Sequence, residues 1–200
     1  MTKFICLAGK MQTGKTASAN IIEKHLASLG YTSRITSFAE PLKEMCISIL
    51  NLPRKLVFGT KADKETLTHI CWDTLNLDIR RKYGQGNLRS GPMTIREVLQ
   101  IVGTEIFREQ LYHNVWAEAP FIKSYDDDFV ILDDVRFVNE KIFAEGSGAL
   151  VIRLKRDTGI INEHISETEL DNVKFEHEYK NNASLLELER YLIGVIDAIL

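Results

Sequence analysis

The strongest indication of the fold is an eight-residue motif near the start of the sequence, Gly9-Lys10-Met11-Gln12-Thr13-Gly14-Lys15-Thr16. It matches the pattern G-x-x-x-x-G-K-[ST] at every fixed position. An apolar run, Lys3–Ala8, precedes it, and a helical pattern, Thr16–Leu29, follows it. A strand, a glycine-containing turn and a helix in this order are typical of a loop whose backbone N–H groups bind phosphate. The stretch therefore predicts a phosphate-binding loop between a buried strand and a helix.

The fixed positions of this loop have distinct chemical roles. Glycine at positions 9 and 14 lets the backbone curl so that its N–H groups face phosphate oxygens. Lys15 neutralises the β- and γ-phosphates of a nucleotide, and the Thr16 hydroxyl is a ligand for Mg²⁺. The residues expected to bind the triphosphate are Gly9, Lys10, Gln12, Thr13, Gly14, Lys15, Thr16, Ala17 and, from a later strand end, Arg156.

Strand-like and helical patterns alternate along the rest of the chain. The runs Ser33–Phe38, Phe129–Leu132 and Leu150–Leu154 predict further strands. Helices between consecutive parallel strands are expected to cross over the sheet. The fold class is therefore α/β, a three-layer α/β/α arrangement with a central parallel sheet. The predicted helices after the first are Pro41 to about Leu50, one from Thr94, Asn114–Lys123, Asn139–Glu145 and one capped by Ser184 and Glu187.

Residues 51–92 are the least regular stretch. They contain two of the four prolines and several glycines. They also contain a basic cluster, Arg80, Arg81, Lys82 and Arg89. We expect a single domain over residues 1–200, with 51–92 as an inserted, mobile lid or substrate-binding region.

Length and composition exclude several classes of protein. The 200 residues carry 25 Lys+Arg against 28 Asp+Glu, a net charge of −3, and 44% of them are hydrophobic. These values exclude a disordered chain and a globally basic nucleic-acid binder. No secretory signal or membrane-spanning apolar run is visible. The three cysteines and five histidines show no metal-binding spacing. We therefore expect a cytoplasmic protein with neither nucleic acid nor a membrane as a partner.

Charged residues follow two predicted strands. Asp133-Asp134-Val135-Arg136 comes after the third, and Arg153 and Arg156 flank the end of the fourth. Ligands bind at the carboxyl ends of strands in open α/β sheets. We expect Asp134 to hold Mg²⁺ or to orient an acceptor, and Arg136 to bind phosphate; the alternative is a surface turn with ordinary charges. Arg153 and Arg156 are candidates for the same phosphates, although a solvated position also suits Arg156.

The helix that begins at Thr94 presents a second set of polar side chains. Thr94-x-x-Glu97 fits a capping box, and Arg96 and Gln100 share one face that could meet a nucleotide. Glu105 and Arg108 are either part of that face or an ordinary surface pair. Trp116 is either a core residue or a base-stacking platform. The apolar stripe of this helix is expected to consist of Ile95, Val98, Leu99, Val102 and Ile106.

A phosphate loop alone leaves four functions open: a small-molecule kinase, a GTPase switch, an ATP-driven motor and a nucleotide-binding module. Thr60-Lys61-Ala62-Asp63 has the letters of a guanine-reading motif. It lies in the irregular stretch soon after the second predicted strand, so we interpret it as a coincidence. No nucleophile–base pair stands out, and none is required if the acceptor is a phosphate anion.

Several blocks, in order along nearly the whole chain, resemble the phage-type deoxynucleoside monophosphate kinases, which have a P-loop NTPase fold. The blocks are the phosphate loop, FAEPLKE at 38–44, TIREVLQ at 94–100, Gly103-Thr104-Glu105 with Arg108, DVRFVNE at 134–140, Val151–Leu154 with Arg156, His164-x-Ser166-Glu167, and Asn181-Asn182.

The resemblance implies transfer of the γ-phosphoryl group of ATP, with Mg²⁺, to the 5′-phosphate of a deoxynucleoside monophosphate, giving dNDP and ADP. It implies that the substrate is a small-molecule nucleotide and that the protein is often a homodimer. For a phage protein, it implies a location in the host cytoplasm. A kinase for another phosphorylated small molecule, such as phosphomevalonate, and a nucleotide-responsive binding protein are the alternatives. The candidate residues are Lys15, Arg136 and Arg153 for catalysis, Thr16 and Asp134 for the metal, and Arg96, Gln100, Glu105, Arg108, Trp116, Asp134, Arg136 and Asn139 for the substrate.

Overall fold

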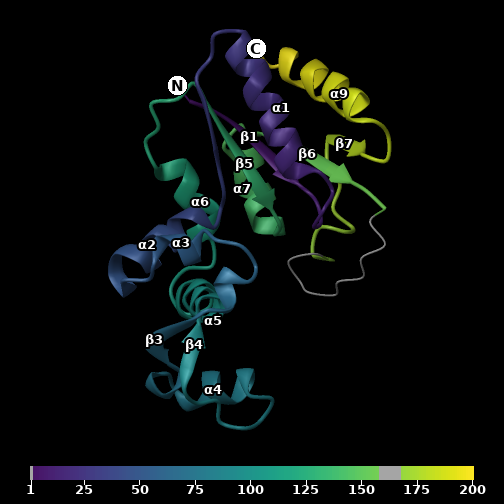
Figure 1. The fold of residues 1–200 in the computed structure, drawn as a ribbon. Helices are drawn as coiled ribbons and strands as arrows, with labels where there is room; N and C mark the ends of the chain where they lie inside the picture. The colour runs from purple at the N-terminus through teal and green to yellow at the C-terminus, as the bar shows by residue number, and fades with distance from the viewer. Residues whose placement is uncertain (1, 158–167) are drawn as a thin grey trace. The chain divides into compact units, whose positions relative to one another are not determined.

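The computed structural model describes residues 2–157 and 168–200, which form two compact units (Figure 1). The first unit joins the chain up to residue 38 with the described residues from 117 onwards. The second unit consists of residues 39–116. The block His164-x-Ser166-Glu167 lies outside the described residues.

The first unit is built on a parallel sheet of five strands in the order β2-β5-β1-β6-β7. The central strand β1 pairs with β5 on one side, where Ile5 lies opposite Ile131, and with β6 on the other, where Cys6 lies opposite Val151. This confirms the predicted central parallel sheet. The strands are β1 (Lys3–Ala8), β2 (Ser33–Thr36), β5 (Phe129–Val135), β6 (Leu150–Lys155) and β7 (His177–Lys180).

Helices cover both faces of this sheet, as the predicted three-layer arrangement requires (Figure 1). Successive residues of a strand point to opposite faces. Ile5 and Leu7 therefore pack with α1 (Lys15–Ser28) and α9 (Leu185–Asp197), whereas Cys6 and Ala8 pack with Ala144 of α7 (Val138–Gly146). Burial of β1 on both faces explains why its sequence is a continuous apolar run.

The second unit has a hydrophobic core of its own. Its elements are α2 (Glu40–Leu50), α3 (Arg54–Val57), η1 (Asp63–Glu65), β3 (Leu67–Cys71), η2 (Trp72–Thr74), α4 (Leu77–Tyr83), β4 (Pro92–Thr94), α5 (Ile95–Gln100), the π-helix η3 (Ile101–Arg108) and the beginning of α6 (Val115–Ile122). Residues 51–92 contribute Leu52, Val57, Trp72 and Ile79 to that core. The irregular-looking stretch is thus part of a packed unit.

The capping boxes follow the sequence closely. The Thr94 and Ser184 hydroxyls accept hydrogen bonds from the backbone N–H groups of Glu97 and Glu187. In return, each Glu carboxylate accepts a hydrogen bond from the backbone N–H of the cap residue. Leu188, Leu192 and Ile196 of α9 are buried. Both helix starts were predicted from these spacings.

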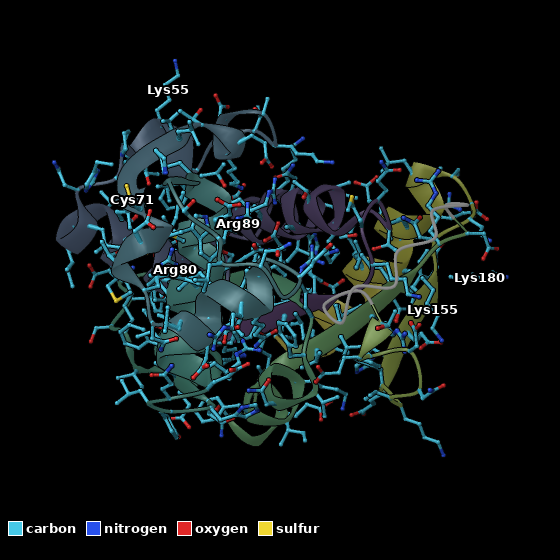
Figure 2. All side chains as sticks on the ribbon, turned by 90° about the horizontal axis from the view of Figure 1, so that it is seen from below. Lys55, Cys71, Arg80, Arg89, Lys155 and Lys180 are labelled. Atoms are coloured by element: carbon cyan, nitrogen blue, oxygen red, sulfur yellow. The ribbon has the colours of Figure 1, made fainter. Side chains whose placement is uncertain are left out.

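Several element boundaries were wrong. β5 runs on through Asp133 and Asp134 to Val135, and β2 ends at Thr36 rather than Phe38. β7 was not predicted, because its sequence His-Glu-Tyr-Lys lacks an apolar run. It is an edge strand that pairs with β6, so polar side chains are tolerated there (Figure 2 labels Lys155 and Lys180, which are register partners).

The predicted apolar stripe of the Thr94 helix is wrong at its end. Ile106 is 39% exposed, whereas Gly103 and Glu105 are buried. From Ile101 onwards the helix is a π-helix, in which residue i bonds to residue i+5. The wider turn changes which side chains face the core. A Cβ at Gly103 would lie 2.7 Å from Leu42 Cδ2, so α2 packs closely against η3 at that glycine.

The described residues include no helix of sufficient length and apolarity to cross a bilayer. Cys6 and Cys46 are buried thiols, and Cys71 is partly exposed. Burial raises the pKa of Cys46 to about 11 and that of Cys6 further. Both groups therefore remain protonated thiols at neutral pH.

Candidate functional site

The phosphate loop follows the carboxyl end of β1. At two of its positions, the backbone conformation and the close neighbours allow only glycine. Gly9 has φ 147° and Gly14 has φ 101°, both in the positive region. A Cβ at Gly9 would lie 2.5 Å from the carbonyl oxygen of Leu154, and one at Gly14 would lie 2.5 Å from Asn181 Nδ2. The two glycines of the motif therefore have both conformational and steric reasons to be glycine.

The side chain of Lys15 folds back over the loop. Its Nζ donates hydrogen bonds to the carbonyl oxygens of Gly9 (2.6 Å) and Lys10 (2.8 Å). Thr13, which is buried, donates from Oγ1 to the same Lys10 carbonyl at 2.9 Å. α1 begins at Lys15, so the positive end of its dipole and the Lys15 ammonium are directed to the same place. Positive charge therefore gathers at the start of α1, a position that favours an anionic ligand.

An open cavity of about 400 Å³ lies against the loop. Thr16 Oγ1 lies 3.5 Å from Asp133 Oδ2 at its wall. Hydroxyl and carboxylate oxygens are the ligands that Mg²⁺ prefers, so the donor chemistry of this pair fits the ion. The residues that line the cavity are Met11, Gln12, Gly14, Lys15, Thr16, Ala17, Asp133, Asp134 and Arg136.

The two neighbouring aspartates have different surroundings. Asp134 Oδ1 accepts a hydrogen bond from the backbone N–H of Phe38 at 2.7 Å, which ties the end of β5 to the segment after β2. Asp133, not Asp134, lies beside Thr16. Both carboxylates line the cavity, and the one within 3.5 Å of the Thr16 hydroxyl is that of Asp133. The sequence expectation selected Asp134 for the metal and passed over Asp133.

The arginines at the strand ends are placed differently from one another. Arg136 lines the cavity with Lys15 and Thr16. Arg153 is only 5% exposed, and its Nη1 donates to the carbonyl of Val173 at 3.1 Å. Asp171 and Glu178 each lie 3.7 Å from its guanidinium. Arg153 is therefore mainly held by its own neighbours, although it lines a small cavity with Gly9, Lys10 and Arg136.

Arg156 lies on the other side of the loop. It is exposed and lines a cavity of about 250 Å³ together with Lys10, Thr13 and Arg153. Lys10 Nζ forms an ion pair with Asp171 at 2.8 Å in the same cavity wall. The structure thus brings Arg156 to the loop, as the sequence suggested, but on a wall separate from the one that Arg136 shares.

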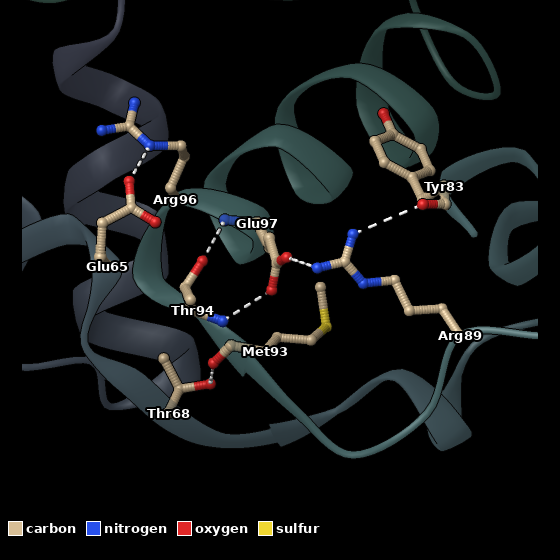
Figure 3. Close-up of polar contacts among 8 residues, drawn as sticks. All are labelled: Glu65, Thr68, Tyr83, Arg89, Met93, Thr94, Arg96 and Glu97. Carbon is tan, nitrogen blue, oxygen red and sulfur yellow. Dashed lines mark hydrogen bonds and ion pairs between the residues drawn. The ribbon is translucent and has the colours of Figure 1, made fainter. Parts of the chain in front are cut away.

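The predicted substrate residues in the second unit form internal contacts there. Arg96 Nε donates to Glu65 Oε1 at 2.6 Å (Figure 3), and Gln100 is exposed. Trp116 is buried and its indole N–H donates to the carbonyl of Gly103 at 2.8 Å, which places it in the core. Arg108, in η3, is partly buried.

Glu105 is not in an exposed pair with Arg108, because it is 4% exposed and accepts hydrogen bonds from Lys82 Nζ and Tyr83 Oη, both at 2.8 Å. Burial alone would raise the pKa of Glu105, but these hydrogen bonds outweigh burial and lower it. Asn139 belongs to the first unit, where its Oδ1 accepts from the backbone N–H of Glu140 at 3.0 Å.

The basic cluster of residues 80–89 is largely neutralised. Arg80 Nη2 pairs with Asp73 at 2.8 Å, and its Nε donates to the carbonyl of Arg89 (both arginines are labelled in Figure 2). Arg89 pairs with Glu97 and lies over the ring of Trp72 (the Glu97 contact is drawn in Figure 3). These cations stabilise the second unit and do not form a basic patch.

Asn181 contacts the phosphate loop directly, a role that the sequence did not reveal. Its Nδ2 donates to the carbonyl of Thr13 at 2.9 Å, and its backbone N–H donates to the carbonyl of Lys155 at 2.6 Å. The residue is 7% exposed. It therefore links the end of β7 to the turn that holds Gly14. In the sequence, only its position in the Asn181-Asn182 block of the family resemblance pointed to a role for this residue.

The family comparison agrees with this geometry. The family model described as "Deoxynucleotide monophosphate kinase" matches residues 61–192. The chain belongs to this family. A curated protein of Acanthamoeba polyphaga mimivirus, named "Putative deoxynucleotide monophosphate kinase", is 28% identical over 210 residues, which cover 96% of this kinase and 95% of the viral protein.

The family match and the phosphate loop are separate observations. The matched residues of the kinase begin at 61, after the loop has ended at Thr16. They include most of the second unit, the end of β5 with Asp133 and Arg136, and Asn181. The loop is therefore evidence separate from the family match, because its sequence has the fixed residues of a phosphate-binding loop.

The contact between Asn181 and the loop yields a first prediction. We expect Asn181→Ala to raise the KM for ATP about fivefold, because the Thr13 carbonyl loses a buried partner worth about 1 kcal/mol. Steady-state kinetics with varied ATP checks this. Asn182→Ala is the matched control, because Asn182 Nδ2 bonds Asp157 instead of the loop. Equal effects of the two variants would contradict the role given to Asn181.

Proposed function

We propose that the kinase transfers the γ-phosphoryl group of ATP to the 5′-phosphate of a deoxynucleoside monophosphate, with Mg²⁺, giving dNDP and ADP. The cavity in which Lys15, Thr16, Asp133 and Arg136 meet carries this proposal. Transfer between two phosphates needs positioning and charge stabilisation more than a nucleophile–base pair. The cavity supplies cations and Mg²⁺ ligands, and the family supplies the class of acceptor.

Different residues of the first unit bind different parts of ATP and its metal ion. The loop N–H groups and Lys15 bind the β- and γ-phosphates, and Arg136 stabilises the charge that spreads over the γ-oxygens as the bond to the leaving oxygen breaks. Thr16 and Asp133 would hold Mg²⁺, which neutralises phosphate charge when it is bound. The acceptor phosphate oxygen is already an anion, so it attacks without a protein base.

We propose that the second unit binds the acceptor nucleotide. Arg96 and Gln100 of α5 offer a guanidinium and an amide one helical turn apart, and Arg108 follows in η3. Glu105 is left out of this set, because it is buried against Lys82 and Tyr83. Residues 51–92 belong to the same unit, which supports their assignment to the substrate-binding region, and we expect that region to move on ligand binding. Equal proteolysis of that stretch with and without a bisubstrate analogue would contradict such movement.

A coupled assay of ADP release tests the proposal. The enzyme is mixed with ATP, Mg²⁺ and each of the four dNMPs in turn, and with the matching deoxynucleosides as controls. We expect ADP release to be stimulated by one or more dNMPs and by none of the deoxynucleosides, because the acceptor atom belongs to the 5′-phosphate. Absence of stimulation by all four dNMPs, with ATP bound, would overturn the proposed function.

The two aspartates give a second prediction. Asp133→Asn is expected to lower kcat by about 10- to 100-fold at fixed Mg²⁺ and to raise the Mg²⁺ concentration for half-maximal rate, because it removes a charged oxygen beside Thr16. Asp134→Asn keeps an oxygen for the N–H of Phe38 and should leave the Mg²⁺ dependence unchanged. Magnesium titrations of both variants measure this difference. A change in Mg²⁺ dependence for Asp134→Asn and not for Asp133→Asn would assign the metal to Asp134.

A further inference from the structure

The start of α7 is held by carboxylates of the chain itself. The backbone N–H groups of Arg136 and Phe137 both donate to Oε2 of Glu140, at 2.9 and 3.1 Å. The backbone N–H of Val138, where α7 begins, donates to Oε1 of Glu169 at 2.9 Å. Arg136 also lines the cavity at the phosphate loop. The turn that carries one of the cations of that cavity is therefore fixed through three successive backbone donors.

The contacts of Glu140 differ from those of the glutamates at two other helix starts. Glu97 and Glu187 each accept a bond from the N–H of the cap residue, whose hydroxyl accepts a bond in return (the contacts of Glu97 are drawn in Figure 3). Phe137 stands in the cap position of α7, and its ring offers no such acceptor. Glu140 accepts an additional bond from Arg136, which precedes the cap residue. Capping of α7 does not require this bond, so it indicates that Glu140 acts on Arg136.

Glu140 is also a buried carboxylate, because the residue is only 3% exposed. Burial of a carboxylate costs free energy unless hydrogen bonds and favourable charges compensate for the lost water. The two backbone N–H groups and the positive end of the α7 dipole supply that compensation here. Hydrogen bonds to an ionised oxygen are also stronger than those to a neutral one. The backbone of Arg136 is therefore held more firmly than an exposed glutamate could hold it.

We propose that Glu140 is a positioning residue, which fixes the backbone from which the guanidinium of Arg136 reaches the cavity at the phosphate loop. This inference rests on the proposed function, in which Arg136 stabilises the charge of the transferring phosphoryl group. Glu140 acts through Arg136 and does not bind the nucleotide itself. A long side chain such as that of arginine is useful in catalysis only when its base is fixed, because a small displacement of a catalytic group lowers the rate strongly.

A double-mutant cycle in the full-length protein tests this role. Glu140→Gln keeps the size of the side chain and one oxygen but removes the charge. We expect it to lower kcat for dNMP phosphorylation about tenfold, while the KM for ATP stays within about twofold of the wild type. In an Arg136→Ala background the same change should alter kcat by less than about twofold, because the guanidinium that it positions is gone. Equal tenfold losses in both backgrounds would overturn the proposal.

Glu187→Gln is the matched control, because Glu187 caps α9 in the same unit and has no contact with Arg136 among those that hold the cap. Both variants lose a charge at a helix start, so both are expected to lower the melting temperature. Only Glu140→Gln should lower kcat, with the concentration of folded enzyme taken from titration with a non-hydrolysable ATP analogue. An equal fall in kcat for Glu187→Gln would mean that the rate follows stability, and would overturn the proposal.

NMR spectroscopy gives two readouts that do not depend on activity. In the wild type, the backbone N–H groups of Arg136 and Phe137 should exchange with solvent slowly, and exchange at the rate of an unprotected amide would overturn the proposal without any variant. With the ATP analogue and Mg²⁺ bound, the Nε–H signal of Arg136 should be sharp in the wild type and broadened in Glu140→Gln. An Arg136 signal that is the same in both proteins would contradict the positioning role.

The same experiments distinguish a failure of this proposal from a failure of the proposed function. If the wild type phosphorylates no dNMP, but the Arg136 signal is broadened in Glu140→Gln, the proposed function fails and the positioning role stands. If dNMPs are phosphorylated, but Glu140→Gln keeps kcat within about twofold of the wild type, the positioning role fails and the proposed function stands.

Discussion

Lys15→Ala is expected to lower kcat by on the order of 10³-fold or more while the melting temperature changes little. In the structure Lys15 Nζ bonds the carbonyls of Gly9 and Lys10 and lies outside the hydrophobic core, so its removal costs little packing. When ATP is bound, the same ammonium is needed at the β- and γ-phosphates. Steady-state kinetics with a dNMP acceptor and a thermal melt of the same sample measure both quantities.

Two further variants make the Lys15 result specific. Lys15→Arg keeps the charge but changes its shape, and we expect it to recover a small part of the rate. Lys24→Ala removes an exposed lysine on the same helix, α1, and should keep wild-type activity. Full activity of Lys15→Ala would show that the loop is not the catalytic phosphate site, and a collapse of the fold would show that Lys15 is structural.

Arg136→Ala should have the second-largest effect, a fall in kcat on the order of 10³-fold. Arg136 lines the cavity with Lys15, Thr16 and Asp133, and on the proposed function its guanidinium stabilises the charge of the transferring group. The KM for ATP should rise much less than kcat falls, because the interaction strengthens in the transition state. Single-turnover kinetics at saturating ATP and dNMP isolates this chemical step.

The matched control for Arg136 is Arg190→Ala, an exposed arginine of α9 in the same unit. It should leave kcat within about twofold of the wild type, since surface charges far from a site have small effects. Arg136→Lys should recover part of the lost rate through its point charge. If Arg136→Ala kept kcat within about threefold of the wild type, the charge-stabilising role of Arg136 would be wrong.

The parts of the fold with strong local signals could be predicted from the sequence. The motif at 9–16 fixed a strand, a loop and a helix at once, because its glycines and lysine have meaning only in that context. The apolar runs gave β5 and β6, since strands buried on both faces need apolar residues throughout. The capping boxes at Thr94 and Ser184 gave two helix starts.

The features that were missed depend on contacts between distant segments. That Asp133 is the carboxylate beside Thr16, while Asp134 accepts from the backbone N–H of Phe38, depends on the course of β5, which the doublet of letters does not reveal. Asn181 reaches Thr13 across 168 positions of sequence. The burial of Glu105 depends on Lys82 and Tyr83, and the exposure of Ile106 on the π-helical turn. Periodicity predicts neither, because both arise from packing within the second unit.

The most direct test of the central claim follows the phosphoryl group itself by phosphorus NMR. The enzyme is incubated with ATP, Mg²⁺ and a dNMP, and the spectrum is recorded over time. We predict that the γ-signal of ATP is lost as the β-signal of a dNDP rises in equal amount, with Lys15→Ala giving neither change. Conversion of the γ-phosphoryl group to inorganic phosphate, with the dNMP signal unchanged, would contradict the claim that this loop delivers phosphate to a nucleotide acceptor.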